Sequence, residues 1–552
     1  MYKNSLCEAL EAAGVNIPDI LLPDPSRSDY NKWSVVACDQ FTSQPSYWGD
    51  VDGYVGAAPS SLRLILPEIY LPENIDESGH FAARVDSIHK TMDEYLAGGV
   101  FLPPFSGFIL TERAYGGGGR AEREGRRQGY GQGCRKGRRQ RHGLGHGGGY
   151  VYRQRHGLGG GFGYGQGPSR WGLVLAVDLE RYSFEANAKT LIRSSEKTVH
   201  NRLPPRTAIR RGAALELPHA LMLMDDAGQT VIEPLAEAAT AGRLELAYDF
   251  ELMAGGGHIR GFRVCGDALR RAAGALAALA ASAKSAEPPR SPGGGGGEPM
   301  LFAVGDGNHS LAAAKKYWDE LKKSLPQRET ASCPARYALV ELINLRSGAV
   351  CFEPIHRALY NTNAQAVIEA LRVYFANRGA SIIDGEEANP EDGAEAAPCS
   401  SAGVNPEGGA EAAPCSGAGA APGGGAGAAP GSCTVTSSGG FAYEYELIYG
   451  GGKNARLLIN SPASDLPVAE LTGFIDSFCE MNPKVKVDYI HGAEELMRLA
   501  ADEGCFCFRL PPVDKGGLFA AIAANGSLPR KSFSMGEARD KRYYLEARRI
   551  VF

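Results

Sequence analysis

The sequence lacks the features that mark membrane, secreted and zinc-finger proteins. It has no run of about 20 apolar residues, and no apolar segment follows its first residues, MYKNSLCEALEAAG, as it does in a signal peptide. Its 12 cysteines include no pair of Cys-x-x-Cys knuckles, so a structural zinc site is not expected. These absences favour a cytoplasmic protein with reduced thiols and no membrane partner.

Two motifs with a known mechanism are also missing. The Gly-x-x-x-x-Gly-Lys-Ser/Thr sequence of P-loop proteins does not occur, which excludes a P-loop kinase. The segments predicted to fold contain no helix-turn-helix pattern and no basic recognition helix. The net charge of −5 is too small to indicate a partner.

Glycine, in contrast, is abundant, with 72 of 552 residues against a usual share of about 7%. The excess is concentrated in segments whose repeats and low apolar content predict disorder. They are an Arg/Gly/Tyr-rich insertion at 116–170, a Pro/Gly-rich linker at 283–298 and a Gly/Ala/Pro repeat at 389–440.

The basic insertion at 116–170 has two interpretations. Its 12 Lys/Arg and 2 Glu give a charge of +10, which suits weak contact with nucleic acid through phosphates and stacking. Alternatively, it is a repeat expansion that a surface loop tolerates. The second interpretation is favoured because the insertion separates GFILTERAY from RWGLVLAVDLERY, which are predicted to pair as a β-hairpin.

The remaining residues, about 430 in number, alternate between short apolar segments and amphipathic ones. This alternation predicts an α/β fold, with α+β as the alternative, in which helices flank a mixed sheet. Strands are predicted at 63–70, 107–113, 172–179, 220–226, 300–306, 337–345 and 505–510, and helices at 81–99, 311–325, 468–482 and 493–504. The expected parts are an N-terminal one, 1–115 with 171–282, and a C-terminal one, 299–388 with 441–552.

The run Asp306-Gly307-Asn308-His309-Ser310 lies between a predicted buried strand and a predicted helix. At such a helix N-terminus, backbone N–H groups and the helix dipole favour an anion. Gly305 and Gly307 would let the backbone approach a ligand, and Ser310 or Asn308 would cap the helix. The alternative is an ordinary turn with a capping serine.

Several segments carry a resemblance to a known family. They are KWSVVACDQFTSQPSYW, LRLILPEIYL, LIRSSEKTVHNRLPPR, LELPHALMLMDD, DFELMAGGGHIRGF, FEPIHRAL and LPRKSFSMGEARDKRYYLEARRI. With these segments the chain resembles a widespread, long uncharacterised prokaryotic family. That family usually reads Asp-Gly-His-His-Arg at the motif, and a branch reads Asp-Gly-Asn-His-Ser, as here.

The motif is in turn similar to the phosphate-binding signature of the ParB/sulfiredoxin-like fold. That fold includes nucleotide-dependent partition proteins, sulfiredoxin and free-serine kinases. Ser310 and Asn308 replace the usual Arg and His, which removes a charge-assisted phosphate contact. Sulfiredoxin chemistry needs a cysteine in the motif, and residues 301–320 contain none.

Polar residues at predicted strand–loop junctions complete the expected site. The expected catalytic residues are Asp306, His309, Asp39 and Glu68. Phosphate binding is assigned to Gly305, Gly307, Asn308, Ser310, Arg63, Arg193, His356 and Arg357, and substrate binding to Glu196 and His258. No metal ligands are assigned.

These residues suit phosphoryl transfer, which needs positive groups for the phosphates, usually Mg²⁺, and a carboxylate for the acceptor hydroxyl. The resemblance to free-serine kinases implies a small hydroxyl metabolite, L-serine above all, with ATP, ADP or pyrophosphate as donor. Two alternatives stay open: a ParB-like nucleotide-binding switch without turnover, and a metal-dependent phosphodiesterase or nuclease.

Overall fold

The computed structural model describes residues 2–42, 44–72, 79–115, 169–285, 299–384, 443–464, 466–536 and 538–551. The predicted insertions at 116–170, 283–298 and 389–440 lie outside these residues, apart from short ends that lead into β5 and complete α8. Among the described residues, no helix is both long and apolar enough to cross a membrane. The chain forms two compact units, residues 1–353 with 518–552, and residues 354–517.

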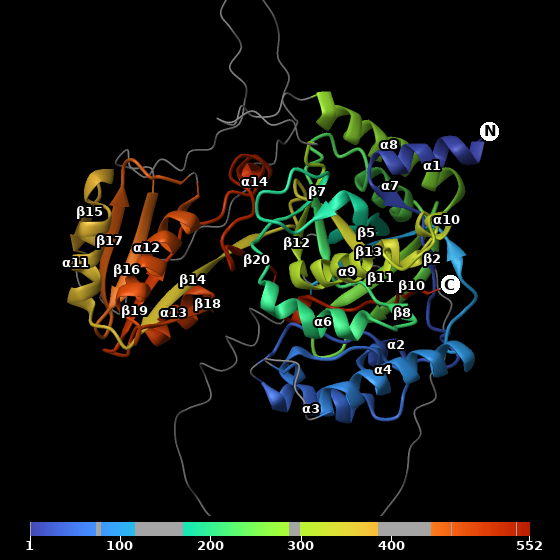
Figure 1. The fold of residues 1–552 in the computed structure, drawn as a ribbon, viewed down its shortest axis with the longest axis horizontal. Coiled ribbons are helices and arrows are strands. Elements are labelled where there is room, and N and C mark those ends of the chain that lie inside the picture. Colours follow the sequence, from blue (N-terminus) through green and yellow to red (C-terminus); the bar gives the residue numbers. More distant parts are fainter. Residues whose placement is uncertain are drawn as a thin grey trace, which may run out of the picture. The chain divides into compact units, whose positions relative to one another are not determined.

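Unit 1 is built on a mixed sheet in the order β10-β11-β4-β5-β13-β9-β12-β7-β6, with β1 beside β5 (Figure 1). The strands are β1 Val15–Asn16, β4 Phe108–Ala114, β5 Arg170–Asp178, β6 Tyr182–Ser183, β7 Ile192–Ser194, β9 Leu221–Met224, β10 Glu245–Glu251, β11 His258–Val264, β12 Phe302–Asp306 and β13 Tyr337–Asn344. β12 runs parallel to β7 and antiparallel to β9. The predicted hairpin is confirmed, because β4 pairs antiparallel with β5.

Helices cover both faces of this sheet. The helices of unit 1 are α1 Tyr2–Ala12, α2 Tyr30–Trp33, α3 Pro45–Val55, α4 His80–Ala97, α6 Leu203–Arg210, α7 Glu233–Thr240, α8 Gly266–Ser285, α9 Asn308–Leu321, α10 Gln327–Thr330 and α14 Leu518–Asn525. α1, α7, α8 and α9 pack on the face that carries Leu110 and Leu175. α2 and α4 pack on the opposite face, with Ile109 and Val174. Alternate strand residues therefore serve two separate cores.

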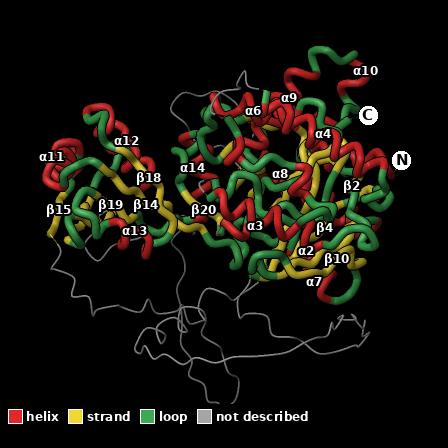
Figure 2. The backbone as a smooth tube through the Cα atoms, turned by 90° about the horizontal axis from the view of Figure 1, so that it is seen from below, coloured by secondary structure: helices red, strands yellow, loops and turns green. Residues whose placement is uncertain are grey.

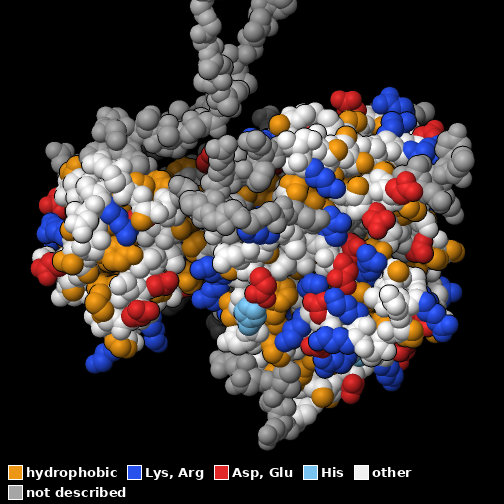
Figure 3. Space-filling model, turned by 45° about the horizontal axis from the view of Figure 1, so that its top comes forward, with side chains coloured by type: hydrophobic (Ala, Val, Ile, Leu, Met, Phe, Trp, Pro, Cys, Tyr) orange, Lys and Arg blue, Asp and Glu red, His pale blue; other side chains and the backbone are white. Residues whose placement is uncertain are grey.

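Helix α9 lies beside α6 on the surface of unit 1 (Figures 1 and 2). Acidic and basic side chains are interspersed over the face of unit 1 seen in Figure 3. Short strand pairs complete the unit: β2 Asp19–Ile20 with β3 Phe105–Ser106, and β8 Leu215–Glu216 with β21 Arg548–Arg549. β20 spans Phe533–Met535.

Unit 2 has its own sheet in the order β15-β17-β16-β19-β14-β18. Its elements are β14 Phe352–Tyr360, which begins at the end of unit 1, β15 Ser381–Asp384, β16 Tyr443–Tyr449, β17 Lys453–Ile459, β18 Lys486–His491, β19 Cys505–Arg509, α11 Ala364–Tyr374, α12 Pro467–Met481 and α13 Ala493–Leu499. α11 and α12 cover one face of the sheet and α13 the other.

The division into units differs from the two parts expected from the sequence. β12 and β13 follow the 283–298 segment, yet they complete the sheet that contains β4 and β5. The last 35 residues, 518–552, also belong to unit 1. Sequence order alone does not reveal which strands pair across such a distance.

The predicted strand at 63–70 is wrong. These residues form two short 3₁₀ helices, Ser61–Leu64 and Glu68–Tyr70. Ser60 accepts a hydrogen bond from the Leu62 N–H, which starts the first turn. Pro67 interrupts the segment, and proline cannot donate a hydrogen bond to a strand ladder.

A buried ion pair joins the C-terminal segment to the core of unit 1. The Arg548 guanidinium donates to Glu216 Oε1 through Nε (2.9 Å) and Nη2 (2.6 Å). Its nitrogens also donate to the carbonyls of Pro334 and Tyr337. Both charged side chains are about 7% exposed, so each carries a high desolvation cost. The pair offsets most of it, and Arg210 Nη2 also donates to Glu216 Oε2 at 2.5 Å.

We predict that Arg548→Leu lowers the free energy of unfolding by about 3–5 kcal/mol, because Glu216 loses its principal partner inside the protein. All tryptophans, Trp33, Trp48, Trp171 and Trp318, lie in unit 1, so urea unfolding followed by tryptophan fluorescence reports on this unit alone. The exposed neighbour Arg549→Leu should stay within about 0.5 kcal/mol of the unmodified protein. Equal effects of the two substitutions would contradict this account.

Candidate active site

The predicted strand–turn–helix around Asp306 is confirmed. β12 ends at Asp306, Gly307 adopts a φ of 77°, and α9 begins at Asn308. A Cβ on Gly307 would lie 2.8 Å from the Ala220 Cα, so both the backbone angle and the lack of space require glycine. The Gly307 N–H donates to Asp306 Oδ1 at 2.9 Å, which fixes this carboxylate at the helix entrance.

The predicted caps are wrong. The N-cap of α9 is Gly307, and no described side chain caps this helix. Asn308 is engaged elsewhere, because its Oδ1 accepts a hydrogen bond from the Ser194 hydroxyl of β7 at 2.5 Å. The N–H groups of the first turn of α9 are therefore left to an external acceptor, and a helix N-terminus of this kind favours an anion.

Gly305 is required by the packing at the end of β12. A Cβ at this position would lie 2.6 Å from Met535 Sδ and 3.0 Å from Leu223 Cγ. Gly305 therefore makes room for neighbouring apolar side chains at the end of β12. Ser310 is the third residue of α9 and is partly exposed.

Lys541 forms an ion pair with Asp306 at the end of β12. Its Nζ lies 2.9 Å from Asp306 Oδ2, and the two side chains are 13% and 22% exposed. Burial opposes the charged form of Lys541, but the carboxylates of Asp306, Asp39 and Glu196 outweigh it and raise its pKa. Lys541 is therefore a charged ammonium surrounded by three acidic residues, all of them predicted for the site.

Asp39 reaches this group because segment 35–37 pairs with segment 541–543. The Ala37 N–H donates to the Lys541 carbonyl at 2.8 Å, and the Tyr543 N–H donates to the Val35 carbonyl at 3.0 Å. Gln40 Nε2 donates to Asp39 Oδ1 at 2.9 Å. Burial disfavours the carboxylate, but His219, Lys541 and this hydrogen bond outweigh it and lower the pKa of Asp39.

Glu68 lies close to Asp39, because the Glu68 N–H donates to the Cys38 carbonyl at 2.8 Å. Its carboxylate forms an ion pair with Arg206, whose Nε donates to Glu68 Oε1 at 2.8 Å. Burial and the negative charge of Asp39 raise the pKa of Glu68 in spite of Arg206. The site therefore contains two acids with opposite pKa shifts, a pattern common in catalytic pairs.

His309, in the first turn of α9, accepts a hydrogen bond at Nε2 from the Val199 N–H at 3.2 Å. An Nε2 that accepts carries no proton, so a neutral ring bears its proton on Nδ1. Burial, together with the positive charges of Arg206, Arg202, Arg530 and Lys531, lowers the pKa of His309 to about 4. His309 is therefore a neutral imidazole beside a group of cations.

Glu196 secures the loop that supplies two of these cations. Its Oε2 accepts from the Lys531 N–H at 3.0 Å, and its Oε1 accepts from the Ser532 N–H at 2.9 Å. Glu196 also pairs with Leu528 in a parallel bridge. Both carboxylate oxygens are thus used to position Arg530 and Lys531.

Sequence reasoning left most of these cations out of the expected site. Arg202 and Arg206 follow Glu196 closely in the chain. The other three cations lie more than 200 residues after Asp306: Arg530, Lys531 and Lys541. The runs LPRK and DKR were the available signal, and they belong to a segment that the family resemblance already included.

The structure places the other expected residues in different surroundings. Arg63 Nη1 donates to Asp52 at 2.5 Å and Nη2 to the Gly56 carbonyl. Arg193 Nε donates to the Thr190 carbonyl beside the sheet, and His258 Nε2 lies 2.8 Å from Asp249 on the neighbouring strand β10.

His356 and Arg357 belong to unit 2. His356 Nδ1 accepts a hydrogen bond from the Leu510 N–H at 3.2 Å, and burial lowers its pKa to about 4 with help from Arg509 and Arg357. The Arg357 guanidinium lies 4.6 Å from the Tyr489 ring centroid. Both side chains are buried in the sheet of unit 2.

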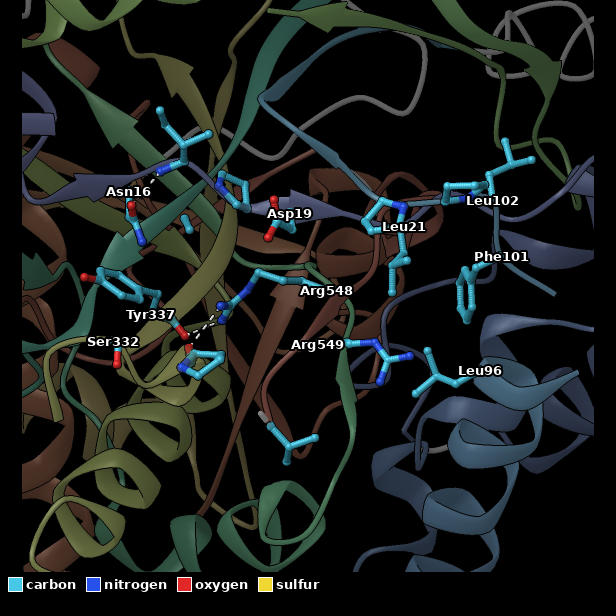
Figure 4. Close-up of a pocket in the computed structure, with 17 residues that line it drawn as sticks. Asn16, Asp19, Leu21, Leu96, Phe101, Leu102, Ser332, Tyr337, Arg548 and Arg549 are labelled. Carbon is cyan, nitrogen blue, oxygen red and sulfur yellow. Dashed lines mark hydrogen bonds between the residues drawn. The ribbon is translucent and has the colours of Figure 1, made fainter. Parts of the chain in front are cut away.

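No metal-binding cluster is apparent in the described part of the chain, where no three His, Cys, Asp or Glu side chains are arranged to hold an ion. A cavity of about 650 Å³ lies elsewhere in unit 1, between β2, the 96–104 segment, Tyr337 and Arg548 (Figure 4). None of the expected site residues lines this cavity. The group around Asp306 is therefore the candidate active site.

We predict that the His309 ring titrates near pH 4, as followed by NMR of histidine-labelled protein, with His309→Gln identifying its signal. Because the folded pKa lies below the ordinary value of about 6.5, the unfolded chain binds the proton more strongly. Stability is therefore complete above about pH 6.5 and falls as the pH drops towards 4, by on the order of 3 kcal/mol. Titration of His309 near pH 6.5 would contradict the buried, neutral ring.

Comparison with solved structures gives remote similarities. A conserved hypothetical protein from Pyrococcus furiosus has 10% identity and a TM-score of 0.28, covering 66% of this chain and 90% of its own. A free serine kinase in complex with AMP has 12% identity and a TM-score of 0.31, covering 68% and 91%. SbnI with a C-terminal truncation, from Staphylococcus aureus, has 7% identity and a TM-score of 0.29, covering 66% and 83%.

No curated protein matches the chain. A family model does match it, over residues 24–126 and 146–461, and these ranges include Asp39, Glu68, Glu196 and the whole Asp306–Ser310 motif. This match extends over most of the sequence, as the resemblance predicted. The chain belongs to the family described as "Protein of unknown function (DUF1015)".

Proposed function

We propose that this protein transfers a phosphoryl group from a nucleotide or pyrophosphate to the hydroxyl of a small metabolite. One observation carries the proposal: Arg202, Arg206, Arg530 and Lys531 act electrostatically on His309 in the first turn of α9, and α9 has no side-chain cap. Cations and free backbone N–H groups at a helix N-terminus are what phosphate oxygens require.

The basic side chains differ in how free they are to bind phosphate. Arg206 is held by Glu68. Arg202 and Arg530 are exposed, and neither forms an ion pair with an acid in the described part of the chain. We assign the donor phosphates to Arg202, Arg530 and the N-terminus of α9, with Asn308 and Ser310 in its first turn.

Asp39 is the proposed general base. Its lowered pKa keeps the carboxylate ionised at neutral pH, whereas Glu68 is engaged by Arg206 and has a raised pKa. In the proposed step the acceptor hydroxyl oxygen forms a bond to the terminal phosphorus, the bond to the leaving phosphate oxygen breaks, and the hydroxyl proton passes to Asp39.

Asp306 and Lys541 hold each other at the entrance of α9, 2.9 Å apart. In this proposal Lys541 keeps Asp306 oriented and offsets the charge of the three carboxylates around it. Mg²⁺ in phosphoryl transfer is commonly held by substrate phosphates and one or two protein carboxylates. Asp306 is the carboxylate suited to that contribution. L-serine as acceptor follows from the resemblance of the motif to free-serine kinases.

The direct test incubates the full chain and Mg²⁺ with ATP, ADP or pyrophosphate and L-serine, and detects phosphoserine by mass spectrometry. We expect Asp39→Asn to lower kcat by about 100-fold or more, the usual effect of losing a general base. Asp50→Asn, an exposed acid on α3, should retain full activity. Absence of a phosphorylated product from L-serine and other hydroxyl metabolites with all three donors would exclude the kinase, and donor binding without turnover would indicate a switch.

The phosphate contacts make a separate prediction. Arg202→Gln and Arg530→Gln should each raise the KM for the donor by roughly 10-fold, since a hydrogen bond to a charged group contributes about 1.5–3 kcal/mol. The KM for the acceptor should change little. Arg243→Gln, an exposed arginine after α7, is the matched control. Unchanged donor KM in both variants would place the phosphates elsewhere.

A further inference from the structure

A second group of arginines lies inside unit 1, on the face of the sheet that packs against α2 and α4. Arg113 of β4 and Arg170 of β5 are direct cross-strand partners, so their side chains emerge on the same face. They are 0% and 5% exposed. Two like charges directly opposite each other in a sheet are destabilising unless something lies between them.

Arg113 is poorly satisfied for a fully buried guanidinium. Its Nη1 donates to the Gly256 carbonyl at 3.1 Å. Its Nε and Nη2 are buried and have no hydrogen-bond partner among the described residues. The guanidinium lies 5.8 Å from the Tyr544 ring centroid and 5.6 Å from that of Tyr115. No carboxylate in the described part of the chain forms an ion pair with it.

The acid on this face belongs to Arg170. Arg170 Nη2 donates to Glu341 Oε2 at 3.1 Å and to the Tyr544 hydroxyl oxygen at 2.8 Å. Glu341 Oε1 accepts from the Thr111 hydroxyl at 2.8 Å. Arg170 Nη1 nevertheless remains buried without a described partner. Both carboxylate oxygens of Glu341 therefore accept hydrogen bonds, and the Nη1 donor of Arg170 still has no described acceptor.

The surroundings add further donors. Arg542 donates through Nη2 to the Met253 carbonyl at 2.8 Å, and burial lowers its pKa to about 10 with a contribution from the Arg113 charge. Glu546 accepts from the Tyr248 hydroxyl at 2.6 Å, and burial raises its pKa to about 7, so it supplies only part of a counter-charge at neutral pH.

Three glycines make space for this polar group. A Cβ on Gly172 would lie 2.2 Å from Glu341 Oε1, and a Cβ on Gly256 would lie 2.6 Å from the Arg542 guanidinium. A Cβ on Gly261 would lie 2.2 Å from the Tyr248 ring. The backbone therefore accommodates the charged side chains at several points, which is the mark of a built site.

We propose that Arg113 and Arg170 together bind one small monovalent anion. The anion would accept from the open nitrogens of both guanidinium groups and separate their charges. Buried donors left without an acceptor cost about 1–3 kcal/mol each, so an anion that accepts from them would stabilise the folded protein. Chloride and the carboxylate of an organic ligand share this chemistry. The proposal uses none of the residues of the proposed kinase site.

The test measures thermal unfolding of the full chain by tryptophan fluorescence in a background of sodium HEPES, a bulky sulfonate. Sodium chloride and sodium formate are titrated separately at constant ionic strength. An anion that binds only the folded state raises the melting temperature with its concentration. We expect this rise in the unmodified protein and in Arg271→Met, an exposed arginine on α8, and at least a 10-fold loss of anion affinity in Arg113→Met.

The two titrations distinguish the source. Stabilisation by both salts identifies a general small-anion site, and stabilisation by formate alone identifies a carboxylate site. If Arg113→Met does not fold, Arg113→Lys keeps the positive charge but removes the open Nε and Nη2 donors and should weaken binding several-fold. Crystals of the unmodified protein grown in bromide should show an anomalous peak between Arg113 and Arg170. The absence of any salt dependence together with a water molecule at that position would overturn the proposal.

Discussion

The ion pair between Lys541 and Asp306 is the contact on which the candidate site depends. It joins the end of β12 to a segment near the end of the chain, and the same segment pairs with residues 35–37 and so brings Asp39 into the group. Along this segment, alternate residues take part in buried polar contacts: Arg542, Tyr544, Glu546 and Arg548. Lys541 thus lies where this segment passes from the buried arginines to the candidate site.

Much of the fold could be predicted from periodicity. The predicted strands other than 63–70 and the four predicted helices are present, and β4 and β5 form the predicted hairpin although 55 residues separate their ends. The error at 63–70 arose because apolar content outweighed Pro67 and the capping Ser60. Local patterns identify elements, whereas the grouping of β12 and β13 with β4 and β5 depends on tertiary packing.

The candidate site also contains residues that the sequence indicated and residues that only the tertiary structure places there. Asp306, His309, Asp39 and Glu68 were recognisable because each follows an apolar segment or lies in a motif, and the structure brings them together. For Lys541, Arg530 and Lys531 the basic runs LPRK and DKR were too weak a signal, since the position of these residues depends on the Glu196 carboxylate and on the pairing of segment 541–543. Arg63 looked suitable in sequence, but Asp52 holds it.

The chain order of the units has a consequence for synthesis on the ribosome. Unit 2 is formed by residues 354–517 alone, whereas unit 1 needs both residues 1–353 and residues 518–552. Chains are made from the N-terminus, and domains generally fold as units. Unit 2 can therefore complete its fold while unit 1 still lacks Arg548 and Lys541. The buried Glu216 and the entrance of α9 receive these cations only when residues 541–548 emerge, so the candidate site is assembled after unit 2 has been synthesised.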